Sequence, residues 1–193
     1  MNLRLTLLVA MVGGGLLAGP TAQAQLSGPI PGGKVRKGIL SFDGHATVGD
    51  FVGTTETVTG EMTGGDQLEA VRGWAEAPVK TLKTKNGKRD KDLNKSMESD
   101  QYPTIRFDLD GVRPGATEGD STAVTLLGRL TIHGVTREVA LPGWVRPEDG
   151  GIRLRSDFPL NLKDYQIGGL TKMLGMLKMQ EDIEVHVDLT FGP

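Results

Sequence analysis

The stretch DIEVHVDLTF alternates between polar and apolar residues at every position from 182 to 191. Ile183, Val185, Val187 and Leu189 fall on one face, and charged or polar residues fall on the other. Successive side chains of a β-strand point to opposite sides of the sheet, so the pattern predicts a strand with one buried and one solvated face. A chain built from such segments must fold so that its apolar sheet faces cover one another.

The same patterning recurs along most of the chain. Regular alternation or an enrichment in Thr, Val and Gly predicts further strands within residues 38–48, 51–62, 67–79, 104–111, 123–145 and 151–162. The segment 123–145 is expected to be a hairpin that turns at His133-Gly134. Seven or eight strands with short connections favour an antiparallel barrel or sandwich, and the periodicity leaves both architectures open.

Two segments depart from the alternation. Residues 88–99 place Leu93 and Met97 four positions apart, which predicts a short charged helix with one apolar stripe. Pro103 prevents the helix from continuing. Residues 168–179 carry leucines and methionines at helical spacing, and this pattern predicts a second short helix.

The N-terminal residues have the pattern of a secretory signal peptide. An arginine precedes an apolar run, and small residues at Ala22 and Ala24 form a cleavage site. We therefore expect residues 1–24 to be removed and the mature protein to be periplasmic or otherwise secreted. Residues 25–37 are rich in Gly and Pro and are predicted to be a flexible leader, and residues 38–193 are predicted to form one domain.

Charge, cysteine content and motifs exclude several classes of function. Removal of Arg4 changes the formal charge from −2 to −3, and this mixed, mildly acidic composition argues against nucleic-acid binding. The chain has no cysteine, which excludes disulfides, thiol chemistry and Cys-based metal sites. Its three histidines lack ligand-like spacing, and no nucleophile elbow, zinc-protease motif or P-loop occurs. We expect no enzymatic activity, no catalytic residue and no metal site.

Three motifs follow one another along the chain. GKRDKDLNKSMESDQYPTIRFDL contains Arg89-Asp90 and Tyr102-Pro103, GRLTIHGVTREVALP contains the run from Gly128 to Gly134, and FPLNLKDYQIGG contains Asp164-Tyr165. In this order they resemble the YceI-like family of polyisoprenoid-binding, lipocalin-like proteins. The resemblance covers residues 38–191 and implies an all-β fold, an eight-stranded antiparallel lipocalin-like barrel with one or two short helices. It implies an isoprenoid lipid of quinone or polyprenol type as the bound ligand, and no other cofactor.

A long isoprenoid tail requires a cavity lined by hydrocarbon. Each buried methylene is worth about 0.8 kcal/mol, and unpaired polar atoms in the cavity would be costly. An eight-stranded barrel has room for one such ligand. The predicted ligand-binding residues are inward apolar residues of the strands and helices, with Trp74 and Tyr102 at the pocket mouth: Phe42, Trp74, Leu93, Met97, Tyr102, Ile105, Phe107, Leu130, Ile132, Leu141, Phe158, Leu160, Met173 and Leu177.

Several alternatives remain open at this level. The same apolar rows could pack as a solid core in a structural or stress-response protein without a ligand. The barrel could also hold haem or another redox cofactor, with His45 or His133 as a ligand. The basic residues from Lys80 to Lys95 could meet a lipid diphosphate or make a transient contact with an anionic membrane, or they could be an ordinary solvated helix start. A homodimer would offer a long tail a deeper, shared cavity.

Overall fold

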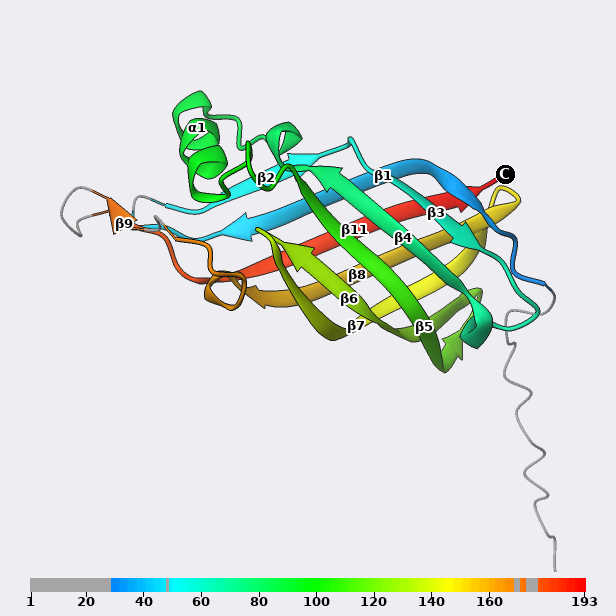
Figure 1. Ribbon diagram of the computed structural model, residues 1–193. Coiled ribbons are helices and arrows are strands. Elements are labelled where there is room, and N and C mark those ends of the chain that lie inside the picture. Colours follow the sequence, from blue (N-terminus) through cyan, green and yellow to red (C-terminus); the bar gives the residue numbers. More distant parts are fainter. Residues whose placement is uncertain (1–28, 48, 169–170, 173–176) are drawn as a thin grey trace, which may run out of the picture.

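The computed structural model describes residues 29–47, 49–168, 171–172 and 177–193; the predicted signal peptide lies outside these residues. In the described residues one antiparallel sheet runs in the order β11-β8-β7-β6-β5-β4-β3-β1-β2 and closes through pairing of β1 with β11 (Figure 1). Its strands are β1 (Gly33–Gly44), β2 (Phe51–Thr55), β3 (Thr59–Thr63), β4 (Arg72–Pro78), β5 (Thr104–Glu118), β6 (Ser121–Ile132), β7 (Val135–Glu148), β8 (Gly151–Asn161) and β11 (Asp182–Gly192).

The closed sheet is a barrel with eight strand positions. β2 and β3 share one position, because β2 pairs with the C-terminal half of β1 and β3 pairs with its first two residues. The predicted eight-stranded antiparallel barrel is therefore confirmed, and the sandwich is excluded. The predicted flexible leader needs correction, since β1 begins at Gly33 and the buried Ile30 exchanges backbone hydrogen bonds with Gly65. The Gly and Pro content of residues 25–37 predicted a flexible segment, but from Gly33 onward its residues pair with neighbouring strands of the sheet.

One α-helix crosses the end of the barrel opposite the C-terminus (Figure 1). This helix, α1 (Gly87–Ser96), is capped by the Asn86 side chain, which accepts hydrogen bonds from the backbone N–H groups of Lys88 and Arg89. Short 3₁₀ turns occupy three connections: η1 (Leu68–Ala70), η2 (Val79–Thr81) and η3 (Leu162–Tyr165). None of the helices in the described residues has the length and apolar character of a membrane-spanning segment.

The second predicted helix is wrong in the residues that the structure describes. β9 (Thr171–Lys172) and β10 (Leu177–Lys178) pair as a short antiparallel ladder. Leu and Met at three- and four-residue intervals over a short segment do not distinguish a helix from a hairpin whose arms are each two residues long. Met173 lies outside the described residues, and so does the side chain of Leu177.

The ladder between β7 and β8 is incomplete. These strands pair only from Trp144 to Glu148, opposite Gly151 to Arg155. Pro142 has no N–H to offer β8, and Ser156 Oγ donates a hydrogen bond of 2.6 Å to the Pro142 carbonyl in place of a backbone donor. Toward the α1 end, Arg137 of β7 donates a hydrogen bond of 2.7 Å to the Asp164 carbonyl of η3.

The seam that closes the barrel carries a titratable group on its outer face. His186 of β11 lies 2.7 Å (Nδ1) from Asp157 Oδ1 of β8 and 3.4 Å (Nε2) from Asp43 Oδ2 of β1. The hydrogen bond to Asp157 raises the pKa of His186, and burial opposes the shift. Protonated His186 therefore ties three adjacent strands together.

We expect the barrel to lose stability as the pH rises through the raised pKa of His186. A histidine with a higher pKa in the folded than in the unfolded chain stabilises fully below the unfolded value of 6.5, and this contribution disappears above the folded pKa. Urea unfolding at a series of pH values should show this loss in the wild type and not in His186→Gln. Asp157→Asn should reduce the pH dependence of the unfolding free energy over the same range. A pH dependence that persists in both variants would contradict its assignment to His186.

Candidate functional site

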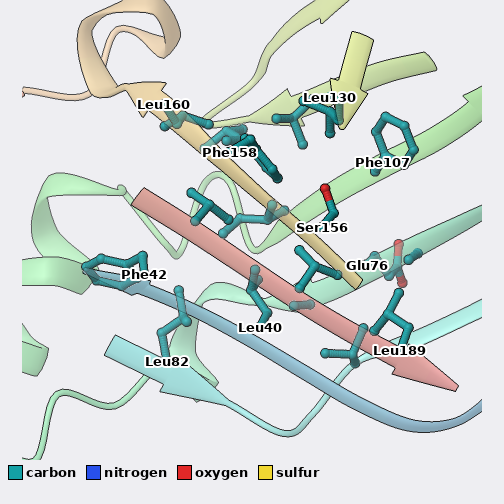
Figure 2. A pocket seen from close by; sticks show the side chains of 18 of the residues that line it. Leu40, Phe42, Glu76, Leu82, Phe107, Leu130, Ser156, Phe158, Leu160 and Leu189 are labelled. Atoms are coloured by element: carbon teal, nitrogen blue, oxygen red, sulfur yellow. The ribbon is translucent and has the colours of Figure 1, made fainter. Parts of the chain in front are cut away.

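The barrel encloses a cavity of about 500 Å³. Figure 2 shows apolar side chains from several strands pointing into it. Inward residues of the middle layer are only partly buried although they face the barrel interior: Leu40, Ala75, Phe107, Leu109, Leu141, Leu154 and Val187. Their remaining accessible surface opens onto the cavity, so the inward rows enclose a hollow and do not meet in a solid core. The volume lies within the usual range for ligand pockets, roughly 300–1,000 Å³.

Buried clusters border the hollow at both ends. At the end that carries the C-terminus, the buried cluster includes Ile30, Met62, Val71, Ile152 and Phe191. At the α1 end, a second cluster combines inward strand residues with side chains of the connecting segments: Val79, Met97, Ile132, Leu160, Leu162 and Ile183. The cavity therefore lies between two packed layers, and a helix covers one of them.

Two oxygen-bearing side chains labelled in Figure 2 both have partners within the protein. Ser156 is buried, and its hydroxyl is bound to the Pro142 carbonyl. The carboxylate of Glu76 lies 3.1 Å from Arg106, which also binds Asp108 on β5. Because these oxygens are satisfied, they impose little desolvation cost on an apolar occupant.

Two phenylalanine rings and an arginine line the α1 side of the cavity. Phe42 of β1 and Phe51 of β2 meet edge to face at 6.1 Å between centroids, and the Arg89 guanidinium lies 4.2 Å from the centre of the Phe51 ring. Two glycines provide the room: a Cβ on Gly53 would lie 2.2 Å from the Phe42 ring, and one on Gly44 would lie 2.5 Å from Phe51. Both phenylalanines and Arg89 border the cavity.

The Arg89-Asp90 pair anchors α1 to the segment before it. Arg89 donates to the Thr84 carbonyl at 3.0 Å, and Asp90 Oδ1 accepts from the Thr84 N–H at 2.8 Å and from its hydroxyl at 2.6 Å. The hydrogen bond from the Thr84 side chain is the main reason that the pKa of Asp90 is lowered. The charges at the start of the helix thus hold the helix in place over the barrel end.

The other two motifs meet around the His133-Gly134 turn. The Tyr102 ring packs edge to face on His133 at 4.6 Å, and a Cβ on Gly134 would lie 2.5 Å from Tyr102. His133 Nδ1 lies 3.2 Å from the carbonyl of Tyr165. Tyr-Pro, His-Gly and Asp-Tyr, which are far apart in the sequence, therefore form one clasp that joins the entry of β5, the β6–β7 turn and η3.

The structure brings most of the predicted site residues together. Those that line the cavity are Phe42, Leu93, Met97, Ile105, Phe107, Leu130, Ile132, Leu141, Phe158 and Leu160. Trp74 also borders it, but its indole faces outward, opposite Asp108 and 4.6 Å from the Arg106 guanidinium. Tyr102 belongs to the clasp and does not line the cavity, because Pro103 and Gly134 direct its ring onto the turn.

Sequence reasoning did not select Ser156 or Phe51 as cavity residues. Ser156 occupies an inward position of an otherwise apolar row, so the alternation itself marks it. Phe51 is the first residue of a short strand, and only its cross-strand pairing with Gly44 shows which way it points. The histidines, all within the described residues, lie outside the cavity lining: His45 binds Asp50, His133 is in the clasp, and His186 is on the outer face.

A closed antiparallel barrel around an apolar cavity defines the class of small barrels that hold a ligand in their interior, as lipocalins do. The chain belongs to the YceI-like domain family, which matches residues 36–191. No functionally curated protein shows significant similarity to it.

Solved structures share the fold at low sequence identity. BcnA of Burkholderia cenocepacia superposes with a TM-score of 0.67 at 12% identity, over 79% of this chain and 95% of that one. A polyisoprenoid binding domain from Saccharophagus degradans, described as implicated in plant cell wall breakdown, gives 0.68 at 13% identity, over 85% and 99%. The YCEI protein of Campylobacter jejuni gives 0.59 at 16% identity, over 73% and 84%.

Proposed function

We propose that this protein is an exported binding protein that holds one long isoprenoid lipid, of the quinone or polyprenol type, in its barrel cavity for carriage or sequestration. The observation that carries the proposal is the hollow centre of the barrel, where inward apolar side chains keep accessible surface between two buried ends. The fold shared with a polyisoprenoid binding domain supports the same ligand class.

The cavity suits a hydrocarbon tail better than a polar ligand. Its wall is formed mainly by Leu, Ile, Val, Phe and Met side chains, and the hydroxyl of Ser156 and the carboxylate of Glu76 have partners within the protein. A tail gains about 0.8 kcal/mol for each methylene removed from water, but it gains little over a bilayer, which is equally apolar. A carrier therefore needs a dry, continuous lining, and the middle layer of the barrel provides one.

The geometry favours binding over redox chemistry or catalysis. A haem ligand would have to point into the cavity, whereas all three histidines lie outside its lining. A purely structural protein would have a solid core, whereas the middle layer of this barrel surrounds a cavity. We therefore propose a role as a binding protein without a catalytic residue.

Organic extraction of the purified full-length protein, followed by mass spectrometry, tests the proposal. We expect an isoprenoid lipid at up to one molecule per protein, together with loss of the predicted signal peptide from the exported form. A delipidated sample should take up added isoprenoid quinone. The bound quinone should quench the tryptophan fluorescence of the protein during the titration. A protein that is isolated empty and also fails to bind added quinones and polyprenols would refute the proposed function.

A further inference from the structure

A basic face lies on α1 and on the segment just before it, and one of its members, Lys88, also borders the cavity. We define it as Lys85, Lys88, Lys91 and Lys95, all of which are exposed. On the helix, positions 88, 91 and 95 follow one another at three and four residues and so share a side. Leu93 and Met97 lie on the opposite side, against the buried cluster at the α1 end. The helix is thus amphipathic: it covers the cavity with hydrocarbon and presents lysines outward.

The local charge differs in sign from that of the whole protein. Between Lys80 and Lys95 seven basic residues stand against Asp90 and Asp92, a net of +5, whereas the full chain carries −2. Asp90 is held by Thr84 at the start of the helix. An excess of this size within sixteen residues produces a positive potential at one end of an otherwise acidic protein.

Carboxylates around the same end of the barrel are engaged within the protein. The pairs are Asp50 with His45, Asp100 with Lys80, Asp164 with Arg137, Glu181 with Lys163, and Asp182 with Asn161. Within the part of the chain that the structure describes, the four lysines of the basic face form no salt bridge. Four of these carboxylates pair with a basic side chain and Asp182 accepts from a neutral amide, whereas the lysines of the basic face remain available to an external anion.

We propose that the basic face docks the α1 end of the barrel onto an anionic membrane surface, where the isoprenoid enters or leaves the cavity; the lipid transfer, though not the docking, rests on the function proposed above. Clusters of four to eight Lys or Arg residues are what anionic leaflets attract, by roughly fivefold in affinity for each residue near the surface. α1 carries most of the basic face and also borders the cavity. Docking at this end would therefore let the tail pass between the cavity and the membrane without crossing water.

Vesicle co-sedimentation tests the docking directly. We expect the full-length protein to bind vesicles of phosphatidylcholine mixed with phosphatidylglycerol, to ignore vesicles of phosphatidylcholine alone, and to be released by high salt. The triple variant Lys85→Gln/Lys91→Gln/Lys95→Gln should bind the anionic vesicles about a hundredfold more weakly. These three side chains do not line the cavity, so the variant should still bind a short-chain isoprenoid quinone in solution.

The matched control removes the same charge at the other end of the barrel. Lys34, Lys37 and Arg113 are exposed on β1 and β5, and their joint replacement by Gln should leave vesicle binding unchanged. Equal binding to neutral and anionic vesicles, or equal losses in the two triple variants, would overturn the proposal. A wild-type protein that docks on anionic vesicles but binds no quinone would refute the proposed function alone and leave the docking in place.

Discussion

Replacing Ala75 with Phe is expected to weaken the binding of the isoprenoid lipid strongly. Ala75 lies on β4, opposite Gly60 on one side and Phe107 on the other, and its methyl group borders the middle of the cavity. A phenyl ring at this position would extend into the hollow. Displacing as few as three methylenes of a bound tail would weaken binding by about 2.4 kcal/mol, roughly sixtyfold.

The lipid-to-protein ratio after extraction, and the affinity for added quinone, measure this effect. Ala140→Phe is the matched control, because Ala140 is exposed on the outer face of β7, opposite Leu127. It adds the same ring without touching the cavity, so it should retain the ligand. Urea unfolding should show that Ala75→Phe remains folded, since the ring fills existing space. Normal lipid content in a folded Ala75→Phe protein would mean that the ligand does not occupy the barrel centre.

Gly134→Ala is expected to destabilise the protein by about 2–5 kcal/mol. Gly134 has φ of +74°, where an L-residue is strained by roughly 1–2 kcal/mol. In addition, the new Cβ would lie 2.5 Å from the Tyr102 ring, so the clasp would have to shift, at a further cost of roughly 1–3 kcal/mol. The free energy of urea unfolding measures the sum of the two effects.

Gly150→Ala separates the backbone strain from the steric clash. Gly150 has the same φ of +74°, but a Cβ there would meet nothing within 4 Å, so its substitution should cost only the strain. In a Tyr102→Ala background the ring is absent, and Gly134→Ala should then cost no more than Gly150→Ala. If Gly134→Ala and Gly150→Ala were equally destabilising in the wild type, the Tyr102 ring would not press on the turn.

The strands and their inward rows follow from local pattern. The alternation from Ile183 to Phe191 specifies which side of β11 is buried, since one register slip would expose the whole row. The charged helix predicted over residues 88–99 lies within a few residues of α1, because the Leu93–Met97 spacing and the stop at Pro103 are local signals, whereas the cap at Asn86 became evident only in the structure. Signals of this kind depend only on neighbours along the chain.

Predictions failed where distant segments decide the conformation. Residues 33–37 of the predicted leader belong to β1, because the edges of β11 and β3 are available to pair with them. Tyr102 was expected at the pocket mouth, but its ring packs against the turn at Gly134. Trp74 turned outward because its partner across the sheet is Asp108, not an inward residue.

The amino-acid sequence by itself determined that this protein is a β-sheet structure, which side chains are inward in most of its strands, and the basic character of the segment before β5. Only the tertiary structure decided that the inward rows surround a hollow of about 500 Å³. The physical reason is that alternation selects a face, whereas a hollow depends on how many strand positions close the sheet. A barrel of eight positions can be filled by its own side chains or can hold one ligand, and here the inward side chains of the middle layer leave the centre open.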